Sequence, residues 1–494
     1  MPRLLLINTW GFGLSTAALL ALIENSPDLT YSRESAHGAH SNWSNFGDIL
    51  IKNMESAVKG RNFSLAMFTC VLGFVLFKRF YRDLGDVFFS FVVIGTLLSA
   101  YYNARTVRKD PVVIAFFISL IVPILSWANS RLQIPELAKA SPSPFFFYSF
   151  FFFWFIAYWT QGKNKRIAAI LFTYCLSILG IYISHSADFF GELFRGLGGA
   201  RIDFSVVNAQ YTSLFAGFGV IAAAFLFLVK INLSFTPEIL KKTIATVFIA
   251  FFTLIVIITQ SRQVWLALVA CLFLTPLAYT AISHSRTSKR TMLISYLVFT
   301  LIISAASSLD IIKNRVSTEG YTLSKIVNME FEAIPDNTSI GVRIHLWLEG
   351  WEWIKERPIL GSGEDSRELV ISESERLPES VKSNFTHLHN SHIETILSFG
   401  LVGACLVYFL ILWPPIFTFV ATEPSVRKTW KTFSLIVTLF WIAVNCFESY
   451  FYSANGIYMF SVFFGIIYSF RFISLETTPN PVQEKPRKKY FCRT

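Results

Sequence analysis

The chain has 494 residues, of which 53% are hydrophobic and 16% aromatic, while only 15% are charged. This composition excludes an ordinary water-soluble globular protein. Apolar runs long enough to cross a bilayer recur along the chain, and backbone polar groups in lipid must be satisfied within helices. The net charge of +11 does not indicate nucleic-acid binding, because Lys and Arg beside membrane spans report orientation. The six cysteines show no CxxC spacing, which argues against a disulfide framework or a zinc site.

The sequence predicts an all-α polytopic membrane protein with about twelve transmembrane helices. Nine of the spans belong to a bundle over residues 64–308, and three C-terminal ones lie within residues 392–472. The expected spans are 64–80, 87–103, 112–127, 145–160, 167–184, 212–229, 243–259, 263–283, 291–308, 392–419, 431–447 and 450–471.

Residues 1–63 comprise an N-terminal segment and a polar loop, and residues 4–23 within them form either a thirteenth span or a signal-like anchor. Six clusters of Lys and Arg, from Arg105 onward, are separated by even numbers of spans, so these six can face the cytoplasm together, whereas Lys78, Arg79 and Arg82 fall in a connection that this arrangement puts outside. Under this arrangement residues 309–391 form one large loop on the outer side, which contains short helices. Residues 473–494 are then a basic cytoplasmic tail.

The end of the polar loop holds the first candidate site. Ser391-His-Ile-Glu394 before an apolar run is typical of a capping box, which puts His389 two residues before the N-cap of a membrane helix. The helix dipole disfavours an imidazolium there, and a neutral imidazole is the form that a general base needs. Alternatively, His387, His389 and His392 are merely polar residues at the start of a helix.

Arg262 is the second candidate, because it lies in a tight outer turn within the first turn of the helix expected at 263–283. A cation at a helix N-terminus opposes the dipole, and charge near the hydrocarbon boundary is costly. A bound phosphate would offset both costs, and it suits the forked donors of Arg. The alternative is an arginine that extends from the interface into water.

Arg343 is the third candidate. Apolar residues recur at helical spacing over 343–355, which predicts an amphipathic helix along the membrane surface. Arg343 and Trp347 share a face of this helix and could hold a lipid-linked phosphate or a sugar ring. Equally, they could form an ordinary interfacial anchor. Arg201, on another outer loop, is a candidate of the same kind.

Taken together, these stretches resemble the O-antigen ligase and polymerase superfamily of bacterial inner-membrane glycosyltransferases. The resemblance covers about residues 200–473, and Gln263 replaces the glycine usual in the first motif. The motifs, in chain order, are Ser261-Arg-Gln-Val-Trp265, Arg343-Ile-His-Leu-Trp347, Glu356-Arg-Pro-Ile-Leu-Gly-Ser-Gly363, His389-Asn-Ser391 and Gly400-Leu-Val-Gly403.

The resemblance implies that a glycan is transferred from undecaprenyl diphosphate to an acceptor on the periplasmic face of the Gram-negative inner membrane. In the ligase branch, which we favour, the acceptor is the lipid A–core oligosaccharide, and no metal, nucleotide or other cofactor is used. His389 would act as the general base of an inverting displacement, while Arg262 and Arg343 would stabilise the diphosphate. The expected substrate contacts are Arg201, Trp347, His387 and Glu394.

Three alternatives remain open. The polymerase sister would use a carrier-linked repeat as acceptor, and a protein O-oligosaccharyltransferase would use a protein hydroxyl. A transporter of lipid-linked glycan belongs to a different class, in which the arginines would line a path. Transport would be favoured by interrupted helices in two matching halves. The motifs gather instead on one side of the membrane, which favours an enzyme.

Overall fold

In a computed structural model, residues 49, 51–103, 107–229, 237–283, 288–317, 320–330, 334–335, 338–420 and 428–476 are described. Over these residues the chain is helical and contains no strand. It divides into two units, Met1–Ala57 and Val58–Thr494. The possible span at 4–23 lies outside the described residues, as does the tail beyond residue 476.

Residues 51–57 of the N-terminal unit are helical, where the sequence predicts a polar loop. Ile51 and Met54 recur at helical spacing in this stretch, a pattern hidden by the polar residues around them. The prediction of a loop is therefore wrong at this point.

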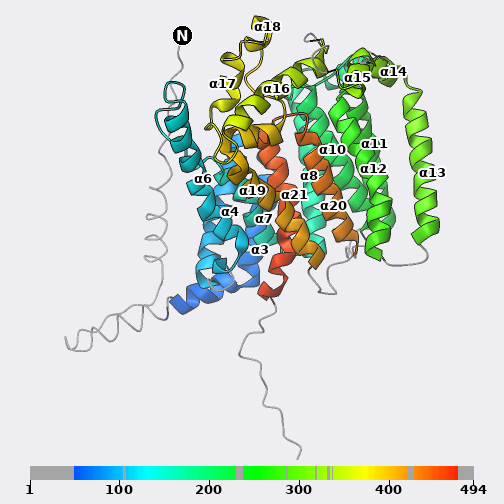
Figure 1. The fold of residues 1–494 in the computed structure, drawn as a ribbon. Coiled ribbons are helices and arrows are strands. Elements are labelled where there is room, and N and C mark those ends of the chain that lie inside the picture. The colour runs from blue at the N-terminus through cyan, green and yellow to red at the C-terminus, as the bar shows by residue number, and fades with distance from the viewer. Residues whose placement is uncertain are drawn as a thin grey trace, which may run out of the picture. The chain divides into compact units, whose positions relative to one another are not determined.

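The second unit is a bundle of helices (Figure 1). Its first members, in chain order, are α3 (Arg61–Phe77), α4 (Arg82–Tyr102), α6 (Pro111–Gln133), η1 (Tyr148–Phe151), α7 (Phe152–Thr160), α8 (Asn164–His185), α9 (Phe189–Leu197), α10 (Ala209–Leu228), α11 (Glu238–Ile258), α12 (Arg262–Ser283) and α13 (Ser288–Ser307). These are followed by α14 (Asp310–Ser317), α15 (Gly320–Val327), α16 (Ser339–Glu356), α17 (Ser366–Ser372), α18 (Glu379–Lys382), α19 (Ser391–Val420), α20 (Lys428–Asn445), η3 (Tyr450–Tyr452), α21 (Ala454–Tyr468) and η4 (Ser469–Glu476).

Several of these helices can cross a membrane, but the count of twelve is not confirmed. Among the described residues seven helices are long and apolar enough, or eight if a bent pair ending at Phe77 is one span. The clearest difference is at 145–160, where only α7 is regular α-helix. Its nine residues extend about 14 Å, against a hydrocarbon core of about 30 Å. The side chains of α7 are nearly all buried in protein. Irregular backbone beside a short helix is tolerated at membrane depth where protein surrounds it.

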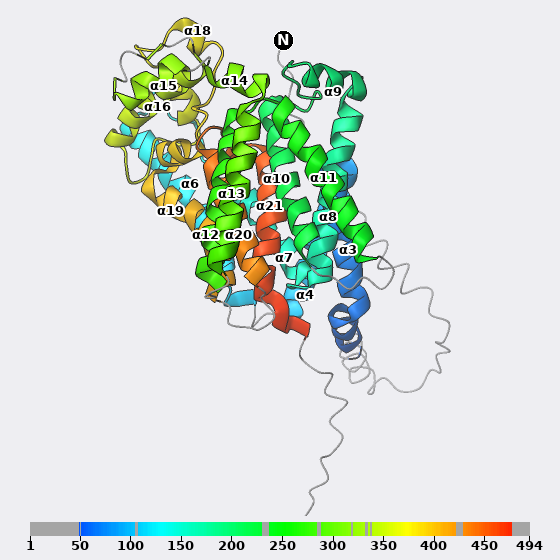
Figure 2. The same cartoon turned by 90° about the vertical axis from the view of Figure 1, so that its right-hand side faces the viewer.

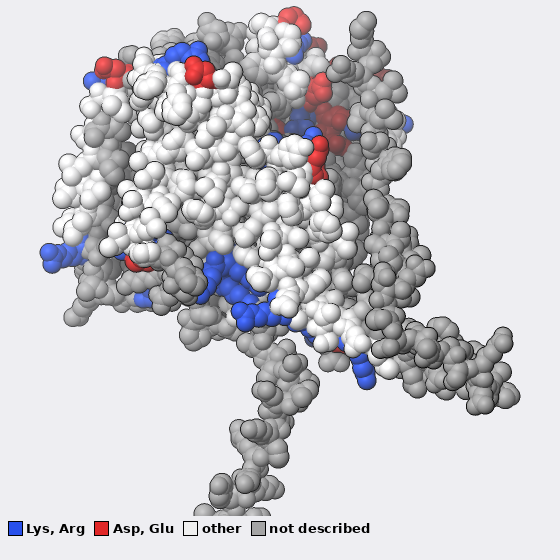
Figure 3. Space-filling model, turned by 180° about the vertical axis from the view of Figure 1, so that it is seen from behind, with Lys and Arg blue, Asp and Glu red and all other residues white. Residues whose placement is uncertain are grey.

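A broad surface without charged side chains lies between a band of Lys and Arg at one end of the molecule and mixed charges at the other (Figure 3). This distribution is typical of a protein that spans a bilayer. In the interior of the bundle lie α10 and α21 (Figure 2), whose residues are mostly buried. Gly217 of α10 packs directly on the Phe440 ring, as is common where membrane helices approach closely.

The polar interval 309–391 forms a helical cap at one end of the bundle, which confirms that it contains short helices (Figures 1 and 2). Within it, the predicted amphipathic helix is α16, which begins four residues earlier than expected, after its N-cap Thr338. The cap has a small apolar core of its own, which includes Leu346, Val370 and Leu388. Part of the apolar face of α16 is therefore covered by protein.

One membrane helix, α19, is broken at Gly400, whose φ of 61° and ψ of −165° are not helical. The segment 358–363 fills the break and bonds to the backbone groups that the break leaves without intrahelical partners. These bonds run from Ser362 N to Leu397 O (2.8 Å), Gly363 N to Ser398 O (3.0 Å), Leu401 N to Pro358 O (2.8 Å) and Val402 N to Ile359 O (3.2 Å). The Arg-Pro…Gly-x-Gly motif thus joins the cap to a membrane span through main-chain hydrogen bonds.

We expect Gly400→Ala to destabilise the protein substantially. A Cβ at this position would lie 2.2 Å from the Ile359 carbonyl oxygen, and the positive φ adds about 1–3 kcal/mol of strain. Gly199→Ala is the matched control, because Gly199 also has a positive φ but no atom within 4 Å of the added Cβ. Thermal unfolding in detergent should show a larger loss for Gly400→Ala. Equal losses would mean that the close contact between 358–363 and α19 does not contribute to the thermal stability.

Candidate active site

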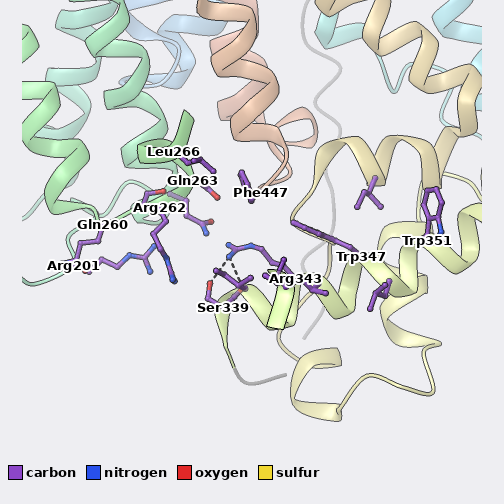
Figure 4. A pocket seen from close by; sticks show the side chains of 17 residues that line it. Arg201, Gln260, Arg262, Gln263, Leu266, Ser339, Arg343, Trp347, Trp351 and Phe447 are labelled. Atoms are coloured by element: carbon purple, nitrogen blue, oxygen red, sulfur yellow. Dashed lines mark hydrogen bonds between the residues drawn. The ribbon is translucent and has the colours of Figure 1, made fainter. Parts of the chain in front are cut away.

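A cavity of about 660 Å³ lies between the bundle and α16. Its polar part is lined by Arg201, Gln210, Gln260, Arg262, Gln263 and Arg343. Its apolar part is lined chiefly by Leu266, Ile344, Trp347, Leu348, Trp351 and Phe447. Figure 4 shows the three arginine side chains directed toward the same space from different elements.

The structure brings together four of the predicted site residues, because Arg201, Arg262, Arg343 and Trp347 all line this cavity. Arg201 follows α9, Arg262 begins α12 and Arg343 lies in the first turns of α16. Arg262 follows a tight turn in which Gln260 has a φ of 52°. The sequence places these residues far apart, so only the packing of the cap on the bundle makes them neighbours.

Hydrogen bonds orient the side chains of Arg201 and Arg343. Arg201 Nε donates to the carbonyl oxygen of Thr259 at 3.3 Å, which connects its loop to the turn before Arg262. Arg343 Nη1 donates to the carbonyl oxygen and the hydroxyl of Ser339 at 3.1 and 2.9 Å. Desolvation, followed by the positive charges of Arg262 and Arg343, lowers the pKa of Arg201. The three cations repel one another, and a polyanion between them would remove that repulsion.

His389 lies beside a buried carboxylate that the sequence analysis missed. His389 Nδ1 is 3.0 Å from Oε1 and 3.1 Å from Oε2 of Glu448, and His387 Nε2 is 3.2 Å from Oε1. Glu448 lies in the short connection between α20 and η3. A lone acidic residue in the connection between two predicted spans was the available signal, but nothing in the sequence assigns it to His389.

The charge state of Glu448 determines which nitrogen of His389 can accept a proton. Burial alone would raise the pKa of Glu448, but hydrogen bonds from His387 and His389 lower it below its ordinary value, and a positive charge on His389 would lower it further. The carboxylate is therefore ionised and accepts hydrogen bonds only. Nδ1 of a neutral His389 then carries the hydrogen, and Nε2 carries the lone pair.

Two contacts connect this pair to the cavity. With its amide nitrogen turned toward Glu448, Gln210 donates to Oε2 of that carboxylate and accepts from Arg343 Nη2 at 2.8 Å. Trp347 donates from Nε1 to the carbonyl oxygen of Leu388, the residue before His389, at 2.8 Å. The arginine cluster and the His389–Glu448 pair therefore belong to one hydrogen-bonded site.

The predicted capping box at the start of α19 is wrong. Asn390 is the N-cap, since its side-chain oxygen accepts from the backbone N–H groups of His392 and Ile393, both at 3.1 Å. Ser391 Oγ donates instead to Asn445 Oδ1 at 2.7 Å. The Ser-x-x-Glu pattern was misleading because both side chains bond to other segments. His389 consequently lies directly before the N-cap, and its φ of 54° is in the left-handed region.

Among the described residues, His387, His389 and Glu448 form a group that could hold a metal ion, because their ligand atoms lie within 4.8 Å of one another. Imidazole and carboxylate are suitable ligands for several divalent metals. Both imidazoles already hydrogen-bond to the same carboxylate, so the arrangement is also complete as a hydrogen-bonded triad. The expectation that no metal is used stays a prediction.

Over the described residues the chain is all-helical with several candidate membrane spans, and three arginines line a cavity near the ends of its helices. Residues 245–408 match the family model described as O-antigen ligase, which supports the resemblance to the O-antigen ligase superfamily that the motifs predict. A protein of Haemophilus influenzae described as uncharacterized is 36% identical over 86 residues. That match covers 17% of this chain and 21% of the relative, about a fifth of its length.

Proposed function

We propose that this protein is an O-antigen ligase. It transfers a glycan from undecaprenyl diphosphate to the lipid A–core oligosaccharide at the periplasmic face of the inner membrane. The family match over residues 245–408 supports a ligase- or polymerase-type function. The identities of the donor and the acceptor, and the mechanism, are parts of our proposal.

The observation that carries the proposal is the convergence of Arg201, Arg262 and Arg343 on one cavity whose remaining walls are mostly apolar and aromatic. A polyprenyl-diphosphate donor joins an anionic diphosphate to a hydrocarbon chain. The cavity offers cations for the first and apolar contact for the second. Its volume of about 660 Å³ lies within the range of ligand-binding sites.

In the proposed reaction, an acceptor hydroxyl oxygen attacks the anomeric carbon of the donor glycan. The new C–O bond forms as the bond from that carbon to the diphosphate oxygen breaks, and the electron pair leaves with the diphosphate. Arg262 and Arg343 stabilise the charge that develops there, with Arg201 as a third cation. Direct displacement by one acceptor inverts the configuration at the anomeric carbon.

His389 is the proposed general base. The acceptor proton moves to Nε2 while Nδ1 keeps its hydrogen bond to Glu448, which stabilises the imidazolium that forms. His387 hydrogen-bonds to the same carboxylate oxygen of Glu448 as His389, and Trp347 lines the cavity wall. We assign these two residues to substrate binding near the reacting groups.

The charge distribution supports a periplasmic site. The band of Lys and Arg in Figure 3 lies at the end of the molecule opposite the helical cap of Figure 1. Positive charge marks the cytoplasmic ends of membrane helices, so we propose that the cavity lies at the outer end.

The function is tested by reconstitution with a carrier-linked glycan and purified lipid A–core. Capped lipopolysaccharide is the expected product. Lengthened carrier-linked polymer would mean that the protein is a polymerase and not a ligase. Glycosylated protein would mean that it is a protein O-oligosaccharyltransferase. Movement of the donor across the membrane without any glycosyl transfer would overturn the enzyme assignment altogether.

Arg262→Lys should lower the transfer rate by about tenfold or more, because an ammonium cannot offer the paired donors of a guanidinium to a diphosphate. Steady-state kinetics with the carrier-linked donor measure this effect. Arg376→Lys is the control, since Arg376 is a largely exposed cation in an ion pair with Glu349. Full activity of Arg262→Lys would mean that Arg262 is an interfacial anchor.

A further inference from the structure

Glu394 lies in the first turn of α19 and is completely buried. Its Oε1 accepts a hydrogen bond from the backbone N–H of Leu388 at 2.8 Å and another from the hydroxyl of Ser449. Its Oε2 is 3.5 Å from Nη1 of Arg367, on α17. One carboxylate thus connects three segments that are separate in the sequence.

The two groups bound to Oε1 are the immediate neighbours of the proposed catalytic pair. Leu388 precedes His389 in the segment before α19, and Ser449 follows Glu448 in the segment after α20. The same oxygen atom therefore fixes both segments from one point. A shift of that atom would change the separation of the His389 imidazole and the Glu448 carboxylate.

A carboxylate without exposure to water is costly unless it is paired and hydrogen-bonded. Here the compensation comes from Arg367, whose guanidinium also lies 4.1 Å from the ring centroid of Tyr452. The Tyr452 hydroxyl in turn donates to Thr395 Oγ1 at 3.2 Å. These contacts hold the carboxylate in one place, and none of them involves a residue that lines the cavity.

The backbone at His389 gives a reason for such an anchor. Its φ of 54° is a conformation that non-glycine residues seldom adopt and that persists where the surroundings enforce it. The N–H of Leu388 is fixed by Glu394 on one side of this position. On the other side, Asn390 is fixed as the N-cap of α19.

We propose that Glu394 is a positioning residue that sets the His389–Glu448 pair through its Oε1, and does not contact the substrate. This replaces the substrate contact that the sequence suggests for Glu394. The inference rests on the proposed function in so far as the pair acts as the base. Its structural part, the placement of two segments by one oxygen, can be measured without any activity.

Three substitutions separate the reach of the side chain from its charge. Glu394→Gln keeps an oxygen at the position of Oε1 but loses the charge that faces Arg367. Glu394→Asp keeps the charge but is one methylene shorter. Glu394→Ala removes both. Because displacement by about 1 Å can cost about 100-fold in rate, we expect kcat to fall in the order wild type, Gln, Asp, Ala, with the donor KM little changed.

The control is Glu364→Gln, which removes a carboxylate paired with Lys139 at 3.4 Å and should leave kcat and KM unchanged. An Asp variant that retains more activity than the Gln variant would overturn the assignment to Oε1. A rise in donor KM with unchanged kcat would show instead that Glu394 contacts the substrate, as the sequence suggests.

Nuclear magnetic resonance of the full chain in nanodiscs gives the independent readout. With nitrogen-15-labelled histidine, eight side chains are visible, and the His389→Gln variant identifies the signal of His389. The wild type and Glu394→Gln should show the proton on Nδ1 in a hydrogen bond to a carboxylate, and Glu394→Asp should lose or weaken it. An unchanged signal in the Asp variant overturns the positioning role, whereas wild-type transfer by His389→Gln overturns only the base assignment.

Discussion

Replacement of His389 by alanine is expected to abolish glycan transfer while donor binding persists. A positioned general base contributes about 10²–10⁴-fold to a rate, and His389 is the imidazole whose Nδ1 hydrogen bond to Glu448 leaves Nε2 to receive the acceptor proton. The arginines that line the cavity are untouched by the substitution. Transfer assays with a carrier-linked donor, together with titration of that donor onto the purified variant, measure both quantities.

His185→Ala is the control for this experiment. The His185 side chain is exposed at the end of α8 and bonds to the carbonyl oxygen of Ile181, so both transfer and donor binding should match the wild type. Wild-type transfer by the His389 variant would reject the base assignment. Loss of donor binding in the same variant would mean that His389 holds the substrate and does not activate it.

The second large effect is expected for Glu448→Gln. A glutamine of the same size can donate its amide hydrogens to Nδ1 of His389, which favours the tautomer in which Nε2 carries the hydrogen and cannot act as the base. In serine proteases, the corresponding Asp-to-Asn change lowers kcat by about 10⁴-fold while the geometry is preserved. We expect a loss of about 10²–10⁴-fold in kcat here.

Kinetics and histidine nuclear magnetic resonance of the Glu448→Gln variant test the tautomer directly. The proton should move from Nδ1 to Nε2 of His389 as activity is lost. Glu192→Gln is the control, since Glu192 accepts a hydrogen bond from Ser186 in another loop. A variant that loses activity but keeps the proton on Nδ1 would show that Glu448 acts through its charge and does not select the tautomer.

The sequence was sufficient to single out several residues that line the cavity, because each is unfavourable or distinctive in its local setting. Arg262 was recognisable because a cation at a helix N-terminus near hydrocarbon is unfavourable by itself. Arg343 and Trp347 were recognisable from helical spacing, and α16 contains both. The resemblance to the O-antigen ligase superfamily then related these motifs to one family, which the match over 245–408 supports.

Local patterns were misleading where a side chain bonds to a distant segment. Ser391 and Glu394 have the spacing of a capping box, yet Ser391 binds Asn445 and Glu394 binds Leu388. The expected span at 145–160 has the composition of a membrane helix but contains only the 3-10 turn η1 and a short α7. Its apolar side chains are buried against other helices. Hydropathy does not distinguish such burial in protein from exposure to lipid.

The sequence alone identified the large polar interval, by contrast with its apolar surroundings. It also indicated the class of protein and most of the residues that we assign to the site. Only the tertiary structure determined that Arg201, Arg262 and Arg343 share one cavity and that His389 is paired with Glu448. The physical reason is that composition and periodicity are local properties of the chain. The pairing of charges across the cap and the bundle depends instead on how the helices pack, including the contact of 358–363 with the break at Gly400.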